Sequence, residues 1–109
     1  MKFEDVNNRA TELFKENHEV KFYEMVLCFS LEELFNETEE ISLSEHQFNK
    51  LLNCMTNYLA DDYHESPWHV ADALVAVIKK HDVDKTIEDF TNDGKLFEAE
   101  LYKIESGSY

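Results

Sequence analysis

Residues that interrupt regular backbone structure are scarce in this chain. Its 109 residues include two glycines and one proline, and Gly94 is the only glycine before the last three residues. An all-β domain needs many turn residues between its short strands. The sequence therefore predicts an all-α fold in which short polar links join the helices. A chain of this length is expected to form one domain, which we place at residues 1–105, followed by a flexible tail at 106–109.

The central element of the predicted fold is an apolar helix at residues 67–81. Ser66 is expected to cap it, and Pro67 suits its first turn, where the missing N–H of proline is tolerated. Three polar side chains fall on one narrow stripe of this helix, and apolar residues cover the rest. These polar residues are His69, Asp72 and Lys79. A helix of this kind is expected to lie at the centre, with Trp68 and the alanine–valine run buried.

Two helices are predicted before the acidic segment at residues 36–43. Apolar residues at helical spacing predict an amphipathic helix from Phe3 to about residue 17. Residues 19–35 are richer in apolar side chains, and a helix fits them best. A strand at 20–29 is the alternative, because aromatic and β-branched residues are dense there.

Three further helices are predicted, two of them after the central one. Ser44 and Gln47 have the form of a capping box, which opens a helix. Asp82 can cap a short helix that ends at residues 92–94, where an asparagine, an aspartate and a glycine occur. Residues 96–104 fit a last helix, with an edge strand as the alternative. In total we expect five or six helices around the central apolar helix.

The two cysteines and the lack of long apolar stretches indicate a cytoplasmic protein. Cys28 and Cys54 lie inside apolar runs, and we interpret them as buried thiols in a reducing compartment. A disulfide between them is compatible with the sequence, but their spacing does not require one. No apolar stretch approaches the roughly 20 residues that span a bilayer. Residues 1–5 lack the basic and then apolar pattern of a signal peptide.

The charge of the chain selects the kind of partner that it can bind. With 24 acidic and 10 basic residues, the formal net charge is −14. Phosphates of nucleic acids and of anionic membranes are bound by lysine and arginine, so this balance argues against both as direct partners. It favours a basic protein as the partner.

No pattern of metal-binding or catalytic residues is evident. The densest group of candidate ligands lies at the junction before the central helix: Asp61, Asp62, His64, Glu65 and His69. His64 and His69 are five residues apart with Pro67 between them, so a regular helix cannot present both on one face. The sequence also lacks a glycine-rich phosphate loop, a Gly-x-Ser-x-Gly motif and a Cys-x-x-Cys motif. We expect no metal, no cofactor and no enzymatic activity.

The remaining candidates for function are acidic residues at helical spacing. Carboxylates on rigid helices can imitate the phosphates of DNA and compete for a basic groove. Asp72 is a separate case, because a carboxylate on an apolar helix needs water, a cation or hydrogen-bond donors. The predicted partner-binding residues are Glu32, Glu33, Glu37, Glu39, Glu40, Asp61, Asp62, Asp72, Asp82, Asp84, Glu88 and Asp89.

One stretch resembles the Ocr family of phage antirestriction proteins, which are small acidic helical DNA mimics. The stretch runs from Ala60-Asp61-Asp62 to Pro67-Trp68-His69-Val70-Ala71-Asp72. The family has an Ala-Asp-Asn, proline, aromatic and Ala-Asp sequence of similar layout, followed by an apolar helix and an acidic segment. This chain is less acidic and lacks the long acidic C-terminal run of that family. The resemblance implies an inhibitor that blocks the DNA-binding surface of a restriction or related defence enzyme, as a monomer or a homodimer.

These observations together give a hypothesis about function. We expect a non-catalytic inhibitor of phage or mobile-element origin, which occupies a basic nucleic-acid-binding site on a host defence enzyme, in an antirestriction or anti-CRISPR role. The alternative is a helical interaction or assembly module that binds its partner through an apolar or aromatic patch. The two differ in their response to salt, because salt screens exposed charges over about 8–10 Å and hardly affects an apolar contact.

Overall fold

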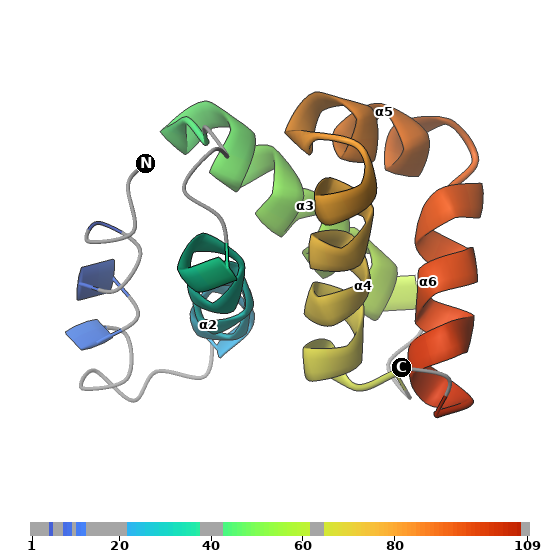
Figure 1. Ribbon diagram of the computed structural model, residues 1–109, viewed down its shortest axis with the longest axis horizontal. Helices are drawn as coiled ribbons and strands as arrows, with labels where there is room; N and C mark the ends of the chain where they lie inside the picture. The colour runs from blue at the N-terminus through green and yellow to red at the C-terminus, as the bar shows by residue number, and fades with distance from the viewer. Residues whose placement is uncertain are drawn as a thin grey trace.

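The computed structural model of the chain is all-α (Figure 1). It describes residues 22–37, 43–61 and 65–107, together with residues 5, 8, 9, 11 and 12. The described residues contain five helices and no strand. The helices are α2 (Phe22–Glu37), α3 (Glu45–Asp61), α4 (Pro67–Lys80), α5 (Val83–Asn92) and α6 (Lys95–Glu105). The predicted fold class is confirmed.

Both segments with a strand alternative are helical wherever they are described. Residues 22–29 belong to α2, and 96–104 belong to α6. Residues 20 and 21, most of the helix predicted from Phe3, and residues 38–42 lie outside the described residues.

Helix α4 is the central element, as the sequence predicts. It packs against each of the four other helices of the described chain, and eight of its 14 residues are buried. In Figure 1, α4 runs beside α6 in the opposite direction, and α5 joins their ends. The polar stripe of His69, Asp72 and Lys79 is exposed, so the amphipathic pattern correctly identifies the one open side of α4.

The boundaries of α4 follow from its sequence. Ser66 is the N-cap residue with an extended backbone, and Pro67 occupies the first helical position. The Ser66 side chain makes no capping hydrogen bond, so the predicted capping role of its hydroxyl is wrong. Two lysines, Lys79 and Lys80, lie in the last turn, where they interact favourably with the negative end of the helix dipole.

Trp68 differs from the expectation. Its side chain is 43 % exposed, although we expected it to be buried with the rest of α4. It stacks on Phe29 of α2, with ring centroids 6.3 Å apart and 27° between the ring planes. Trp68 lies in the first turn of α4, where the contact with Phe29 leaves the indole partly exposed.

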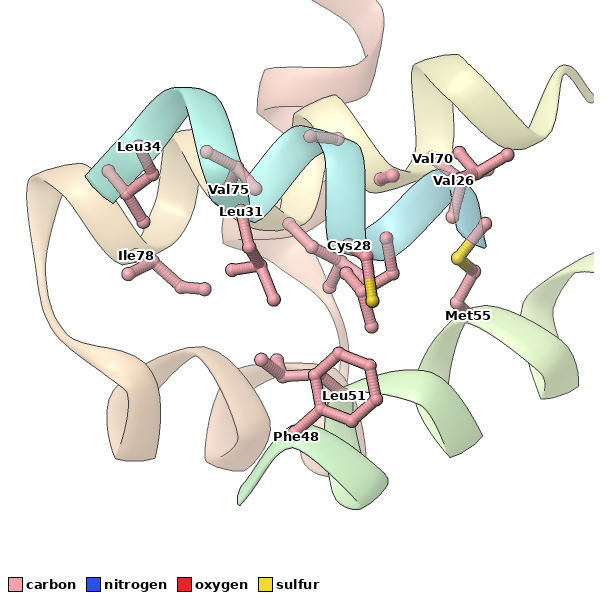
Figure 2. Packing of buried hydrophobic residues seen from close by; sticks show 14 of the residues in the cluster. Val26, Cys28, Leu31, Leu34, Phe48, Leu51, Met55, Val70, Val75 and Ile78 are labelled. Carbon is pink, nitrogen blue, oxygen red and sulfur yellow. The ribbon is translucent and has the colours of Figure 1, made fainter. Parts of the chain in front are cut away.

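The main core lies between α2, α3 and α4 (Figure 2). Leu31 of α2, Phe48 of α3 and Leu74 of α4 are all fully buried within it. Cys28 and Cys54 are buried free thiols, as predicted. Burying a leucine or phenylalanine side chain contributes about 1.5–3 kcal/mol, so this cluster is the main source of stability of the packing.

The capping box at the start of α3 forms as predicted. The backbone N–H of Gln47 donates to the Ser44 hydroxyl (3.1 Å), and the backbone N–H of Ser44 donates to Gln47 Oε1 (2.9 Å). Two N–H groups that the helix itself leaves unpaired are thereby satisfied. The cap thereby restricts the position of the Gln47 side chain.

Candidate acidic partner-binding surface

The predicted partner-binding residues occupy different environments in the structure. Glu39, Glu40 and Asp62 lie outside the described residues, and Glu37 is the last residue of α2. Glu32 is half-buried and Asp89 is buried. The six that are exposed are Glu33, Asp61, Asp72, Asp82, Asp84 and Glu88.

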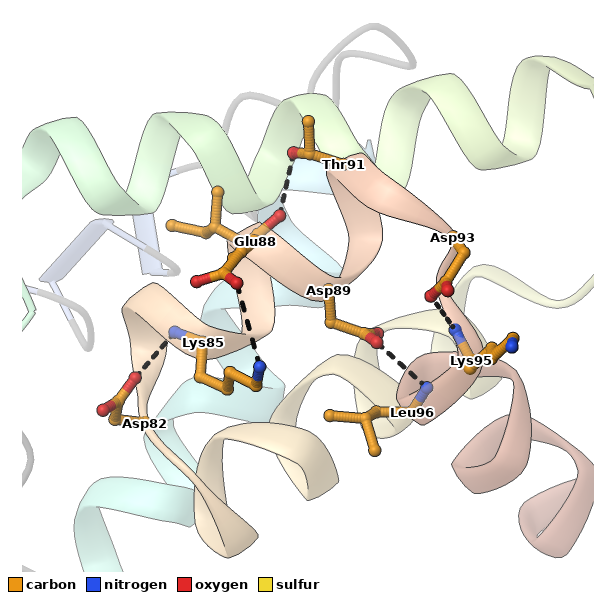
Figure 3. A network of polar contacts seen from close by, with 9 residues as sticks. Asp82, Lys85, Glu88, Asp89, Thr91, Asp93, Lys95 and Leu96 are labelled. Carbon is orange, nitrogen blue, oxygen red and sulfur yellow. Dashed lines mark hydrogen bonds and ion pairs between the residues drawn. The ribbon is translucent and has the colours of Figure 1, made fainter.

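Three of the exposed carboxylates belong to α5 or its N-cap, and Figure 3 shows two of them, Asp82 and Glu88. Asp82 is the N-cap residue of α5, and its Oδ1 accepts a hydrogen bond from the backbone N–H of Lys85 at 2.6 Å. This confirms the predicted cap. Asp84 lies in the first turn, and Glu88 follows one turn later, with its Oε1 3.8 Å from the Lys85 ammonium. Carboxylates near a helix N-terminus are favoured by the helix dipole.

A side-chain contact connects α5 with the start of α3. Gln47 Nε2 donates a hydrogen bond of 2.9 Å to Asp84 Oδ1. Because the capping box holds Gln47, this bond restricts Asp84 as well. Glu45, in the first turn of α3, is exposed, and its Oε1 lies 3.6 Å from the Arg9 guanidinium.

We call the carboxylates of Glu45, Asp82, Asp84 and Glu88 the α3–α5 acidic surface. The sequence prediction did not include Glu45. The capping box placed Glu45 correctly on the first turn of a helix, but only the contact between Gln47 and Asp84 brings that turn next to α5. A tertiary contact of this kind leaves no periodic signal in the sequence.

Asp72 and Glu33 lie on neighbouring helices away from this surface. The Ser30 hydroxyl of α2 donates a hydrogen bond of 3.1 Å to Asp72 Oδ1. Glu33 is one turn beyond Ser30 on α2, so both face the same side of that helix. The sequence places His69 and Lys79 on the same stripe as Asp72, but it does not reveal Ser30 as the donor, because Ser30 comes from a different helix.

Asp89 has a structural role, which its sequence position among exposed acids does not indicate. It is only 9 % exposed. Its two carboxylate oxygens accept hydrogen bonds from the backbone N–H groups of Leu96 and Phe97, each at 3.1 Å. Both donors belong to the first turn of α6, so Asp89 caps α6 from the neighbouring helix (Figure 3). Its carboxylate faces the protein interior, and we leave it out of the α3–α5 acidic surface.

A second buried acid, Glu100 of α6, ties α6 to α4. Its Oε1 lies 2.6 Å from the Lys80 ammonium and 3.8 Å from that of Lys103. The hydrogen bond from Lys80 to Glu100 raises the pKa of the lysine. Glu100 Oε2 and Glu32 Oε2 are buried and have no hydrogen-bond partner in the described part of the chain.

The thiols do not have the properties of nucleophiles. Burial raises the pKa of Cys28 from 9.0 to about 12, and the nearby Arg9 guanidinium only partly offsets it. Burial also raises the pKa of Cys54. Both groups are therefore protonated at neutral pH, whereas the reactive form of cysteine is the thiolate.

The described residues offer neither a metal-binding cluster nor a membrane-spanning helix. They contain no cluster of three or more histidine, cysteine, aspartate or glutamate side chains with the proximity of metal ligands. None of the helices that the structure describes has the length and apolar character of a transmembrane segment.

We compared the chain with models of protein families, with curated proteins and with solved structures, and none of the three comparisons found a significant match.

Proposed function

We propose that this chain is an acidic, non-catalytic inhibitor that occupies a basic nucleic-acid-binding site on a host defence enzyme. The observation that carries the proposal is the α3–α5 acidic surface, in which the Asp82 carboxylate is held by the α5 cap and the Asp84 carboxylate by a hydrogen bond from α3. The proposed source is a phage or a mobile element. The proposed action is that of an antirestriction or anti-CRISPR protein.

The spacing of these carboxylates suits a site that binds phosphates. Asp84 and Glu88 are four residues apart on α5, which corresponds to about 6 Å along the helix axis. Phosphates on one DNA strand follow each other about every 3.4 Å along the duplex, so the two carboxylates are about two phosphate steps apart.

The rigidity of this surface supports binding without a large entropic cost. Immobilising a long side chain on binding costs about 0.5–1.5 kcal/mol. In the free protein the Asp82 and Asp84 carboxylates already accept hydrogen bonds. Part of the entropic cost of ordering these two side chains is therefore incurred on folding and not on binding. The net charge of −14 adds long-range attraction to a basic partner, which accelerates association.

The test is inhibition of DNA cleavage by purified defence enzymes, with a restriction enzyme complex and a CRISPR effector complex as targets. We expect the protein to inhibit one of them and the inhibition to weaken steeply between low and moderate salt. The variant Asp84→Asn with Glu88→Gln should inhibit about tenfold less well, because both charges face the partner.

The matched control is Glu98→Gln with Glu105→Gln, which removes the same charge from exposed positions on α6. It should inhibit within about twofold of the original protein, since these two charges lie outside the α3–α5 acidic surface and act on the partner only through the net charge. Failure to inhibit either class of enzyme, or equal losses in the two variants, would overturn the proposal.

A second candidate function is an interaction module that binds through aromatic side chains. It is favoured by the exposure of Trp68, which is 43 % accessible and stacks on Phe29. Tryptophan is enriched among residues that dominate binding energy at interfaces. A partner captured in a salt-independent manner and lost on Trp68→Ala, but retained on Tyr102→Ala, would identify this function. Tyr102 is the matched control because it is 74 % exposed on α6.

A further inference from the structure

A hollow of about 440 Å³ lies between α3 and α5, beside the α3–α5 acidic surface. Its walls combine apolar and polar groups. From α3 come the side chains of Lys50, Asn53 and Asn57, and from α5 those of Ile87 and Phe90. Its volume is within the range of about 300–1,000 Å³ that is usual for ligand sites.

The apolar part of the hollow is fixed by packing. Ile87 and Phe90 are partly buried against the core. The Phe90 ring meets Tyr58 and Phe97 edge to face, with centroids 6.3 Å and 5.3 Å away. Buried Cys54 also lines the hollow. The hollow therefore offers a preformed apolar floor for a side chain of a ligand.

The polar part of the hollow has hydrogen-bonding capacity that the protein does not use. Lys50, Asn53 and Asn57 are exposed. Within the described part of the chain these three side chains form neither hydrogen bonds nor ion pairs. Each asparagine amide supplies a donor group and an acceptor, and the lysine supplies donors only. A ligand bound here can therefore both accept hydrogen bonds from these side chains and donate hydrogen bonds to the asparagines.

The spacing of the two asparagines matches an extended polypeptide. Asn53 and Asn57 are four residues apart on one face of α3, or about 6 Å along the helix axis. In an extended chain, alternate residues present their N–H and C=O to the same side and repeat about every 6.6–6.8 Å. The two asparagine amides can thus pair with the backbone groups of two alternate residues of an extended chain.

From this geometry we propose that the hollow binds an extended segment of the partner, whose backbone pairs with Asn53 and Asn57 and whose apolar side chain rests on Ile87 and Phe90. The inference rests on the proposed function, because it names the part of the basic partner that this face takes up. Lys50 donates to a backbone carbonyl of the same segment.

The surrounding charge selects a basic segment. Asp84 lies three residues before Ile87, and Glu88 lies three residues before Thr91, which also lines the hollow, so each carboxylate shares a face of α5 with a residue of its wall. Lysine or arginine side chains of the segment can therefore pair with them. A nucleotide, which could also use Lys50 and the asparagines, would bring its phosphates close to these two carboxylates, so the charge favours the peptide.

The test is an NMR titration of the ¹⁵N-labelled protein with the peptide acetyl-Lys-Val-Lys-Leu-Lys-amide. We expect the side-chain amide signals of Asn53 and Asn57 to shift with added peptide. The Asn49 signal should not move, because Asn49 is an exposed residue of α3 that does not line the hollow. The same peptide with N-methylated backbone amides keeps its charges but loses its donors, and it should bind at least about tenfold more weakly.

Variants of the asparagines distinguish binding in the hollow from general attraction of a basic peptide to an acidic protein. Asn53→Ala with Asn57→Ala should weaken the peptide about tenfold or more, and Asn49→Ala should leave its affinity within about twofold. Equal binding of the N-methylated peptide, or unchanged affinity of the double variant, would overturn the proposal. Saturable binding of adenosine monophosphate with the same asparagine shifts, in place of the peptide, would also overturn it.

The outcomes distinguish this inference from the proposed function. If the neutral peptide acetyl-Ser-Val-Ser-Leu-Ser-amide binds as well as the lysine peptide, the hollow is a peptide site to which the acidic surface does not contribute. That result would count against the proposed inhibitor function. If a defence enzyme is inhibited while neither peptide shifts the two asparagine signals, the inhibitor stands and the hollow is not its peptide site.

Discussion

Asp89 shows how a single carboxylate can serve the fold from inside an acidic helix. Gly94, the N-cap residue of α6, has φ +65° and has no side chain that could cap the helix. Asp89, five residues earlier, supplies the missing acceptors for Leu96 and Phe97. The left-handed backbone needed at the turn selects glycine, and the cap then has to come from elsewhere.

Replacing Asp89 should therefore cost stability. We expect Asp89→Ala to lower the free energy of unfolding by about 2–3 kcal/mol, because the buried N–H of Phe97 and the partly buried N–H of Leu96 lose a charged acceptor. Urea denaturation followed by circular dichroism measures this. Glu88→Ala, at the exposed neighbouring position, should change stability by no more than about 0.5 kcal/mol. Equal effects at the two positions would contradict the capping role.

Cys28 makes the stability depend on pH in the alkaline range. Its pKa is about 12 in the folded protein against 9.0 for an exposed thiol. The unfolded chain thus loses a proton more readily, so this contribution to stability is complete below pH 9 and is lost as the pH rises toward 12. We expect Cys28→Val to reduce the slope of the free energy of unfolding with pH above 9. An unchanged slope would mean that other groups determine it.

The contrast between Asp89 and Glu88 marks a limit of sequence analysis. Both acids lie on α5 and both were assigned to partner binding. Their roles differ because α6 folds back over one side of α5 and covers Asp89 only. The sequence holds one hint, namely a glycine at the start of α6 where a capping side chain is usual, but a tertiary contact decides which residue supplies the substitute acceptor.

At the scale of helices, two serines at N-cap positions test how much a capping side chain contributes. The Ser44 hydroxyl accepts a hydrogen bond from the Gln47 backbone, whereas the Ser66 hydroxyl makes no such bond. We expect Ser44→Ala to destabilise the protein by about 1 kcal/mol. Ser66→Ala should have an effect below about 0.5 kcal/mol. Thermal unfolding of the two variants compares them directly, and a larger effect at Ser66 would contradict the structure.

The helices were largely predictable because their boundaries are local. The Ser44–Gln47 pair and Asp82 each define a helix start through hydrogen bonds within a few residues, and Pro67 does so through its fixed φ angle. Helix α2 was harder, because it is buried on more than one side and its apolar residues do not form a single stripe. The exposure of Trp68 could not be predicted, since it depends on where α2 crosses α4 rather than on the sequence of either helix.

The candidate site was predictable only in part. The acids of α5 were identified from composition and spacing, and Asp82 and Asp84 are exposed as the hypothesis requires. The association of α5 with the start of α3 depends on the bond between Gln47 and Asp84, 37 residues apart. The hollow with Asn53 and Asn57 was missed for the same reason, because neither helix forms it alone.

At the scale of the whole molecule, the excess of acid predicts a response to salt. The 24 acidic and 10 basic residues repel one another on balance. Raising the ionic strength from about 0.01 M to about 0.15 M shortens the screening length from about 30 Å to about 8 Å. We expect the melting temperature to rise by a few degrees, about 4–8 °C for each 1 kcal/mol gained.

Calorimetry at a series of sodium chloride concentrations measures this rise. The variant Glu98→Gln with Glu105→Gln, which carries two fewer charges, should show a smaller rise. A melting temperature that falls with salt would mean that ion pairs such as Lys80–Glu100 outweigh the repulsion.

The order of the helices has a consequence for folding kinetics. Helices α4, α5 and α6 are consecutive, and the bonds of Asp89 at the corner between α5 and α6 join residues only seven and eight positions apart. Contacts between near neighbours close small loops and form early. We therefore expect the segment formed by α4, α5 and α6 to be the folding nucleus onto which α2 and α3 dock. Stopped-flow measurements should show that Leu101→Ala mainly slows folding, whereas Leu51→Ala mainly accelerates unfolding.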